Sequence, residues 1–212
     1  MSRSRFNGLY SIYHLLGILN HEDIKNHKVF ESKTPSHPEI DKLAYIDAST
    51  GIGSRYSNGY WYGWSLRYLK NKFNREKFEI FNHQIYVLCG DGDLQEGVAF
   101  EAIQLAGTQK LDNLVIVHDF NNMQIDSSSS EVNDVDFKQF FKAQKFNVMI
   151  LKSNEPEEII KALEKTKKLS GPTYIQVPTT IAFGTKVANT PKGHNGVLIL
   201  RRYNYLQKII RT

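Results

Sequence analysis

Four short apolar runs, separated by segments with helical periodicity, constrain most strongly what this chain of 212 residues can fold into. The runs occupy residues 85–89, 114–117, 148–151 and 173–177. Their length and their β-branched residues predict strands that are buried on both faces. Apolar residues recur at helical spacing between the runs, in residues 94–106, in residues 135–145 and in a segment that begins near Pro156. Because strands alternate with helices along the chain, we expect an α/β domain with a mainly parallel sheet flanked by helices.

The ends of the predicted helices carry local signals. Gly107 is expected to stop the helix that starts at Leu94, because glycine is common just after a helix. Ser153 or Asn154 can cap the helix that has Pro156 in its first turn. These signals predict where each helix begins and ends.

The whole chain is expected to form one domain, because its length suits a single domain with a full core. Residues 84–178 carry the regular alternation of strands and helices, whereas residues 1–83 are less regular. In that first part, helices are expected around residues 9–19 and 60–72. The aromatic residues of the second helix are interpreted as packing or interface residues: Tyr60, Trp61, Tyr62 and Trp64.

Composition excludes several classes of protein. No apolar run approaches the roughly 18–20 residues that a membrane-spanning helix needs, and the N-terminus does not resemble a signal peptide. The single cysteine, Cys89, excludes an internal disulfide, predicts a reducing cytoplasmic setting and is interpreted as a core residue. The net charge of +5 is mild, and the densest basic cluster, residues 200–211, is interpreted as a solvated amphipathic end, with a binding surface as the alternative. We therefore expect neither a nucleic acid nor a membrane as partner.

Polar residues follow two of the predicted strands, where open α/β sheets bind their ligands. Gly90-Asp91-Gly92-Asp93 leads into a helix, whose N-terminus favours phosphate, but Asp91 would repel phosphate unless a divalent cation lay between them. The next strand is followed by His118-Asp119-Phe120-Asn121-Asn122-Met123. A carboxylate, an amide oxygen and a backbone carbonyl suit Mg²⁺ bound to a diphosphate. A plain turn with Asp91 or Asp93 as a helix cap is the open alternative.

Two common nucleotide-binding motifs do not fit this turn. A dinucleotide fingerprint would need glycine where the chain has Gln95, and no Gly-Lys-Ser/Thr follows that would make a P-loop. A flavin- or nicotinamide-binding protein is therefore disfavoured.

The segment from Gly90 to Asp126 resembles the thiamine diphosphate-binding signature of transketolase-like enzymes. The resemblance is carried by Gly90-Asp91-Gly92, by Asn121-Asn122 about thirty residues later, and by much of the sequence between them. It extends upstream to Ser32-Lys33-Thr34-Pro35-Ser36-His37-Pro38-Glu39 and downstream to Thr180–Gly184 and His194-Asn195-Gly196. The family implies the diphosphate-binding domain of the thiamine diphosphate fold.

The resemblance also implies a cofactor site for thiamine diphosphate and Mg²⁺ (or Ca²⁺). The ligands of the cation would be Asp91, the side chain of Asn121 and the carbonyl of Met123. The residues near the cofactor would be Gly90 and Gly92 at the diphosphate, Ile125 at the rings, and His194 at the diphosphate or the reacting carbonyl. His37 and His194 would be the catalytic histidines, and Glu96 would lie near the partner subunit. The other histidines are given no role, and His118 is expected at a strand end.

The chain departs from the family pattern in three places. Ser4 or Arg5 stands where the family has a Gly-His pair, and Arg55 and Tyr56 replace small residues of a glycine-rich loop. No sequence that could form the family's pyrimidine-binding domain follows. We therefore expect the N-terminal subunit of a split transketolase, which transfers a two-carbon ketol unit between sugar phosphates with a separate pyrimidine-domain subunit in a homo- or hetero-oligomer. The alternative is a degenerate, catalytically inactive relative that acts in interaction or regulation.

Overall fold

The computed structural model describes residues 3–35, 38, 42–43 and 54–195. The chain divides into two compact units. The core unit comprises residues 51–120 and 132–179, and the second unit comprises residues 1–50, 121–131 and 180–212. His37, residues 51–53 of the glycine-rich loop and the basic segment 200–211 lie outside the described residues.

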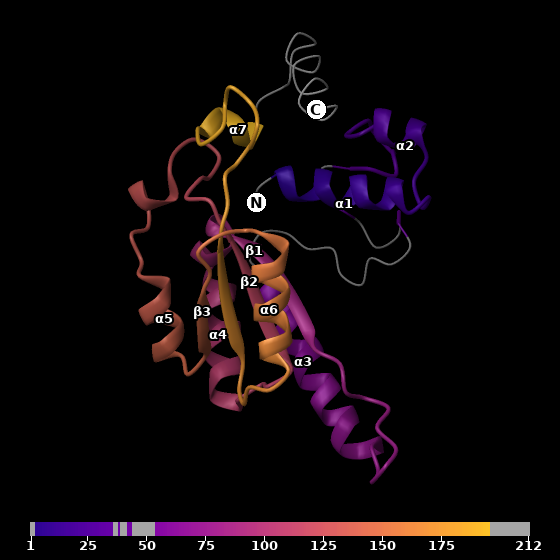
Figure 1. The fold of residues 1–212 in the computed structure, drawn as a ribbon, viewed down its shortest axis with the longest axis vertical. Helices are drawn as coiled ribbons and strands as arrows, with labels where there is room; N and C mark the ends of the chain where they lie inside the picture. Colours follow the sequence, from indigo (N-terminus) through magenta and orange to yellow (C-terminus); the bar gives the residue numbers. More distant parts are fainter. Residues whose placement is uncertain (1–2, 36–37, 39–41, 44–53, 196–212) are drawn as a thin grey trace. The chain divides into compact units, whose positions relative to one another are not determined.

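A parallel sheet of four strands forms the centre of the core unit (Figure 1). The strands are β1 (Ile85–Gly90), β2 (Leu114–Phe120), β3 (Asn147–Ile150) and β4 (Thr173–Pro178), in the spatial order β1-β2-β4-β3. Every neighbouring pair is parallel, which confirms the predicted α/β class. Gly90 pairs with Asp119 in the register of β1 and β2, so the carboxyl ends of these two strands lie side by side.

Helices pack on both faces of this sheet. The helical elements of the core unit are α3 (Ser54–Phe73), the 3-10 turn η1 (Asp91–Gln95), α4 (Gly97–Gln109), α5 (Phe137–Ala143) and α6 (Pro156–Thr166). Residues of α3, α4 and α5 bury one face of the sheet, with Ile103 and Phe141 near the middle of that core. On the other face, Ala162 of α6 packs with Val115 and Ile175. Alternating strand residues therefore serve two separate layers, as the continuous apolar runs predict.

The predicted bounds of α4 are wrong at both ends. The chain first makes the η1 turn, so the α-helix begins at Gly97 rather than Leu94, and it continues past Gly107 to Gln109. Lys110, with a φ of 50°, forms the left-handed C-cap. Gly107 lies inside this helix. The position requires glycine, because a Cβ atom there would lie 1.9 Å from the backbone oxygen of Gln144. The glycine therefore marks a close approach between α4 and the residue that follows α5, and it does not mark the end of a helix.

The predicted cap of α6 is also wrong. Glu155 occupies the N-cap position, and its side chain makes no capping hydrogen bond. The carboxylate of Glu158 instead accepts hydrogen bonds from the backbone N–H of Lys152, at 2.8 Å, and from the hydroxyl of Ser153, at 2.6 Å. Acceptance of these hydrogen bonds lowers the pKa of Glu158. The serine therefore does not occupy the cap position: its hydroxyl donates to Glu158 and accepts the backbone N–H of Glu155 at 3.4 Å in the turn before the helix.

The second unit is built from short elements. They are α1 (Arg3–Leu15), α2 (His21–Lys25), the 3-10 turn η2 (Ser129–Glu131) and α7 (Pro191–Asn195). Tyr10, Tyr13 and Leu19 form a small buried cluster with Leu43. Asn20 and Asp23 cap α2 reciprocally, because each side chain accepts the other residue's backbone N–H. Within the described residues, no helix has the length and the apolar character that a membrane crossing requires.

Candidate functional site

The Gly-Asp-Gly-Asp turn buries two carboxylates at the carboxyl end of β1. Asp91 as a whole residue is 3% exposed, and Asp93 is fully buried. The carboxylate of Asp93 accepts the backbone N–H of Gly90 at 2.9 Å, so this residue closes the η1 turn. Burial of a carboxylate is costly unless hydrogen bonds or a cation compensate its charge. The turn therefore gives Asp93 a structural role and holds the Asp91 carboxylate almost out of contact with solvent.

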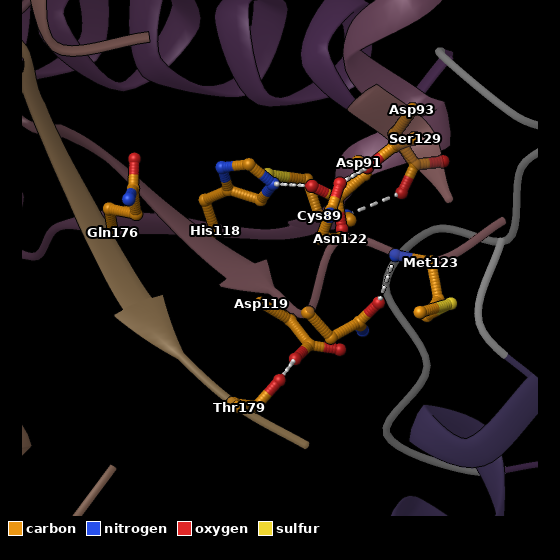
Figure 2. A network of polar contacts seen from close by, with 12 residues as sticks. Cys89, Asp91, Asp93, His118, Asp119, Asn122, Met123, Ser129, Gln176 and Thr179 are labelled. Atoms are coloured by element: carbon orange, nitrogen blue, oxygen red, sulfur yellow. Dashed lines mark hydrogen bonds and ion pairs between the residues drawn. The ribbon is translucent and has the colours of Figure 1, made fainter. Parts of the chain in front are cut away.

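A buried polar network lies beside Asp91 in the core unit (Figure 2). His118 of β2 is fully buried, and its Nε2 atom lies 3.5 Å from Oδ1 of Asp91. The Nδ1 atom of the same ring lies 2.6 Å from the hydroxyl of Tyr174 on β4, and that hydroxyl lies 3.1 Å from Oε1 of Gln176. Burial raises the pKa of Tyr174 well above its usual value, so the phenol keeps its hydrogen. Side chains from β2 and β4 thus form a hydrogen-bonded network beside the Asp91 carboxylate.

Sequence reasoning missed this network. The expectation that His118 sits at a strand end is wrong, because β2 runs to Phe120 and places His118 within the strand and in the core. The available signal is a histidine that directly continues a run of four apolar residues, 114–117. Cys89 is also fully buried, as predicted, and its thiol donates to the carbonyl of Val117 at 3.6 Å.

The end of β2 is joined to the segment after β4 by hydrogen bonds within the core unit. Asp119 accepts a hydrogen bond from the hydroxyl of Thr179, a contact that Figure 2 shows. The backbone N–H of Thr179 donates to the carbonyl of Phe120 at 2.9 Å. These bonds hold the backbone immediately before Asn121.

The loop of residues 121–131 belongs to the second unit and is closed by asparagine side chains. The amide oxygen of Asn121 accepts the backbone N–H of Met123 at 3.0 Å. Asn122 has a φ of 54°, and its amide oxygen accepts the hydroxyl of Ser129 at 2.9 Å (Figure 2). The same oxygen accepts the backbone N–H of Ser130 at 3.0 Å. Asparagine tolerates this left-handed conformation better than most residues. The loop therefore has a defined shape around the two predicted ligands Asn121 and Met123.

The remaining predicted site residues lie in different environments. Ile125 is 49% exposed, which leaves an apolar surface that a ligand could cover. His194, in α7 of the second unit, is 5% exposed. Glu96 is the N-cap residue of α4. The described residues contain no group of three or more His, Cys, Asp or Glu that could hold a metal ion, but the predicted ligand set contains only one such residue, Asp91.

Known proteins resemble both the sequence and this fold. The profile of the family "Transketolase, thiamine diphosphate binding domain" matches residues 6–204. A transketolase of Staphylococcus epidermidis is 36% identical over 191 residues, which cover 89% of this chain and 28% of that protein. A transketolase of Mycoplasma genitalium is 38% identical over 187 residues, which cover 88% of this chain and 29% of that protein. A crystal structure of a transketolase from Pichia stipitis is 30% identical, with a TM-score of 0.90 over 95% of this chain and 30% of that chain.

Together with the structure, these similarities identify the class and the family of this protein. The parallel sheet, with buried carboxylates at its carboxyl edge, is that of an α/β protein of the thiamine diphosphate-binding fold. The chain belongs to the family of transketolase thiamine diphosphate-binding domains. It spans less than a third of the length of the curated relatives it matches.

Proposed function

We propose that residues 1–212 form one diphosphate-binding domain and act as the N-terminal subunit of a split transketolase. The observation that carries the proposal is the buried Asp91 carboxylate in the Gly-Asp-Gly turn of a chain that matches this family over residues 6–204. The transketolases that it matches are more than three times as long, with coverage of 28% and 29%. A separate pyrimidine-domain subunit would supply the rest of the active site, in a homo- or hetero-oligomer.

The residues present fit thiamine diphosphate and a divalent cation. Asp91 offers an oxygen ligand that is almost fully buried, and an adjacent hard cation would compensate the cost of its burial. We assign the Asn121 side chain and the Met123 carbonyl as the other protein ligands of Mg²⁺ or Ca²⁺. Gly90 and Gly92 would lie against the diphosphate, because glycine lets the backbone approach closely. Ile125 would contact the rings with its exposed apolar side chain.

The proposed reaction moves a two-carbon ketol unit from a ketose phosphate to an aldose phosphate. The bond between C2 and C3 of the donor breaks, the shortened aldose leaves, and a new carbon–carbon bond forms at the aldehyde of the acceptor. The bound cofactor would supply the electron sink that this carbon–carbon chemistry needs. Crystal structures of the Pichia stipitis transketolase contain sedoheptulose-7-phosphate, xylulose-5-phosphate or fructose-6-phosphate, which supports sugar phosphates as the substrate class.

The histidines would contribute proton transfer and positioning. We propose that His37 faces the substrate channel and that His194 approaches the diphosphate or the reacting carbonyl. The burial of His194 supports a role inside a protein-lined site rather than on a solvated surface. Cys89 as the single cysteine supports a reducing cytoplasmic location.

Co-expression with candidate pyrimidine-domain proteins tests the proposal. The purified complex should bind thiamine diphosphate with Mg²⁺ in calorimetry and should transfer the ketol unit in a coupled assay, whereas either chain alone should show little transfer. Asp91→Ala should abolish both binding and transfer. Asp112→Ala is the matched control, because it removes an exposed carboxylate that precedes β2 at the opposite edge of the sheet.

The outcomes separate the proposal from its alternative. A stable complex that binds neither cofactor nor cation would favour the degenerate interaction or regulatory protein. Binding and transfer that survive Asp91→Ala would show that the ligand assignment is wrong. Full activity of the isolated chain would contradict the split enzyme.

A further inference from the structure

The imidazole of His118 lies behind Asp91, and the proposed function leaves it without a role. Both side chains are out of contact with solvent, at 0% exposure for His118 and 1% for Asp91. Within the described part of the chain, the Nε2 atom of His118 makes no hydrogen bond, and it faces Oδ1 of Asp91 at 3.5 Å. A buried imidazole nitrogen aimed at a buried carboxylate indicates an electrostatic pairing between β2 and the η1 turn.

The hydrogen-bond chain behind His118 allows two positions for the single ring hydrogen of a neutral imidazole. The phenol of Tyr174 has one hydrogen and two neighbours, Nδ1 of His118 at 2.6 Å and the amide of Gln176 at 3.1 Å. If the phenol donated to Gln176, Nδ1 would carry the imidazole hydrogen, and the lone pair of Nε2 would face the carboxylate. If the phenol donates to Nδ1, the Nε2–H group faces the carboxylate instead.

The second arrangement is electrostatically favourable throughout. It requires only that the Gln176 amide present its NH₂ group to the phenol oxygen, which is a half-turn of that side chain. The first arrangement would place a lone pair against an anion in a site of low dielectric, where such contacts are most costly. The short distance between Tyr174 and Nδ1 also agrees with a strong O–H donor at that nitrogen.

Aromatic packing holds the two members of this pair in place. The ring of Tyr174 stacks on Phe141, with centroids 3.8 Å apart and an interplanar angle of 11°. The imidazole of His118 meets the edge or face of Phe137 and Phe120, with centroids 5.2 Å and 5.5 Å away. Neither ring can rotate without opening the core, so the direction of Nε2 is set by packing.

We propose that His118, held by Tyr174 in the tautomer that carries its hydrogen on Nε2, is the positioning residue for the Asp91 carboxylate. The identity of the cation that Asp91 binds rests on the proposed function, whereas the pairing itself rests on the distances between these side chains within the core unit. Outer partners that orient a ligand typically govern metal affinity by about 10–100-fold. The His118–Tyr174 pair therefore connects the packing of β4 to the strength of the cation site.

Nitrogen-detected NMR of the full chain, without cofactor or cation, tests the pairing directly. The spectrum should show the hydrogen of His118 on Nε2, and Asp91→Ala should shift that signal. Tyr174→Phe keeps the stacked ring but removes the donor, so the preference for this tautomer should weaken. A hydrogen on Nδ1 and none on Nε2 in the unmodified chain would overturn the proposal.

Cation affinity tests the consequence. Mn²⁺, bound together with thiamine diphosphate and measured by electron paramagnetic resonance, should bind about 10–100-fold more weakly to Tyr174→Phe and to His118→Leu. His118→Gln should restore most of the affinity, because its amide can donate near the place of Nε2. Tyr86→Phe is the matched control, since its phenol is on the exposed side of β1 and bonds only Gln84 among the described contacts.

The two measurements distinguish this inference from the proposed function. Unchanged Mn²⁺ affinity in both Tyr174→Phe and His118→Leu would refute the positioning role. If the unmodified chain, alone and with its partner, bound no Mn²⁺ and cofactor, the proposed function would fail, and the tautomer measurement would still decide whether His118 is paired with Asp91.

Discussion

Gly107 provides the sharpest test of how the core unit is packed. Alanine in place of glycine within an exposed helix usually stabilises by about 1 kcal/mol. At position 107, however, the added Cβ would lie 1.9 Å from the backbone oxygen of Gln144 and 3.0 Å from its carbonyl carbon. A backbone carbonyl cannot swing aside as a flexible side chain can, so α4 and the end of α5 would have to move apart.

The clash should outweigh the gain in helix propensity. Overpacking a core typically costs about 1–3 kcal/mol, and a backbone collision belongs at the upper end of that range. We therefore expect Gly107→Ala to lose about 2 kcal/mol of net stability. For a chain of this size, that loss corresponds to a fall in Tm of about 4–8 °C.

A thermal melt followed by circular dichroism measures this change, with Gly63→Ala as the control. Gly63 also lies inside a helix, α3, but its nearest neighbour would be the side-chain oxygen of Asn113 at 3.4 Å, an ordinary contact. The control should melt at the temperature of the unmodified chain or slightly above it. A Tm for Gly107→Ala at or above that of the unmodified chain would refute the steric argument, and equal losses at both positions would point to a general effect of alanine.

Two further predictions concern the loop after β2 and the buried phenol. Asn122→Ala should speed hydrogen exchange at the amides of Ser129 and Ser130, because it removes the side-chain acceptor and strains a φ of 54° by about 1–2 kcal/mol. Asn122→Gly should expose mainly the Ser130 amide, since glycine keeps the backbone conformation, and equal exchange in both variants would contradict this. Burial raises the pKa of Tyr174 above that of a tyrosine in the unfolded chain. The neutral phenol therefore contributes fully to the free energy of unfolding below about pH 10, and this contribution is lost at higher pH, where the tyrosine of the unfolded chain ionises. Urea unfolding of Tyr174→Phe should show a smaller loss above about pH 10 than the unmodified chain, and an identical slope would exclude this cause.

Local sequence patterns predicted the strands well because burial on both faces leaves an apolar run that needs no knowledge of the neighbours. All four runs became strands, although β2 extends through His118 to Phe120. The extension was missed because the polar residues 118 and 119 look like the end of a strand. Their hydrogen-bond partners, Tyr174 and Thr179, come from β4 and the residue after it, far along the chain.

Helix ends were predicted less well because short-range signals competed with tertiary contacts. Gly107 looks like a stop signal, but its role depends on Gln144, which approaches it from α5. Ser153 looks like a cap, but Glu158 takes both of its donors. In each case one residue type can play either of two structural roles. Only the neighbours in three dimensions show which role the residue has.

The candidate site divides in the same way. Sequence by itself determined the class of fold and the Gly-Asp-Gly turn with its Asp91, because the residue types that approach a phosphate and bind a hard cation follow one another along the chain. Only the tertiary structure decided that His118 and Tyr174, 56 residues apart, meet behind that carboxylate. Pairing of β2 with β4 brings them together, and strand order depends on which faces the helices cover rather than on any local pattern.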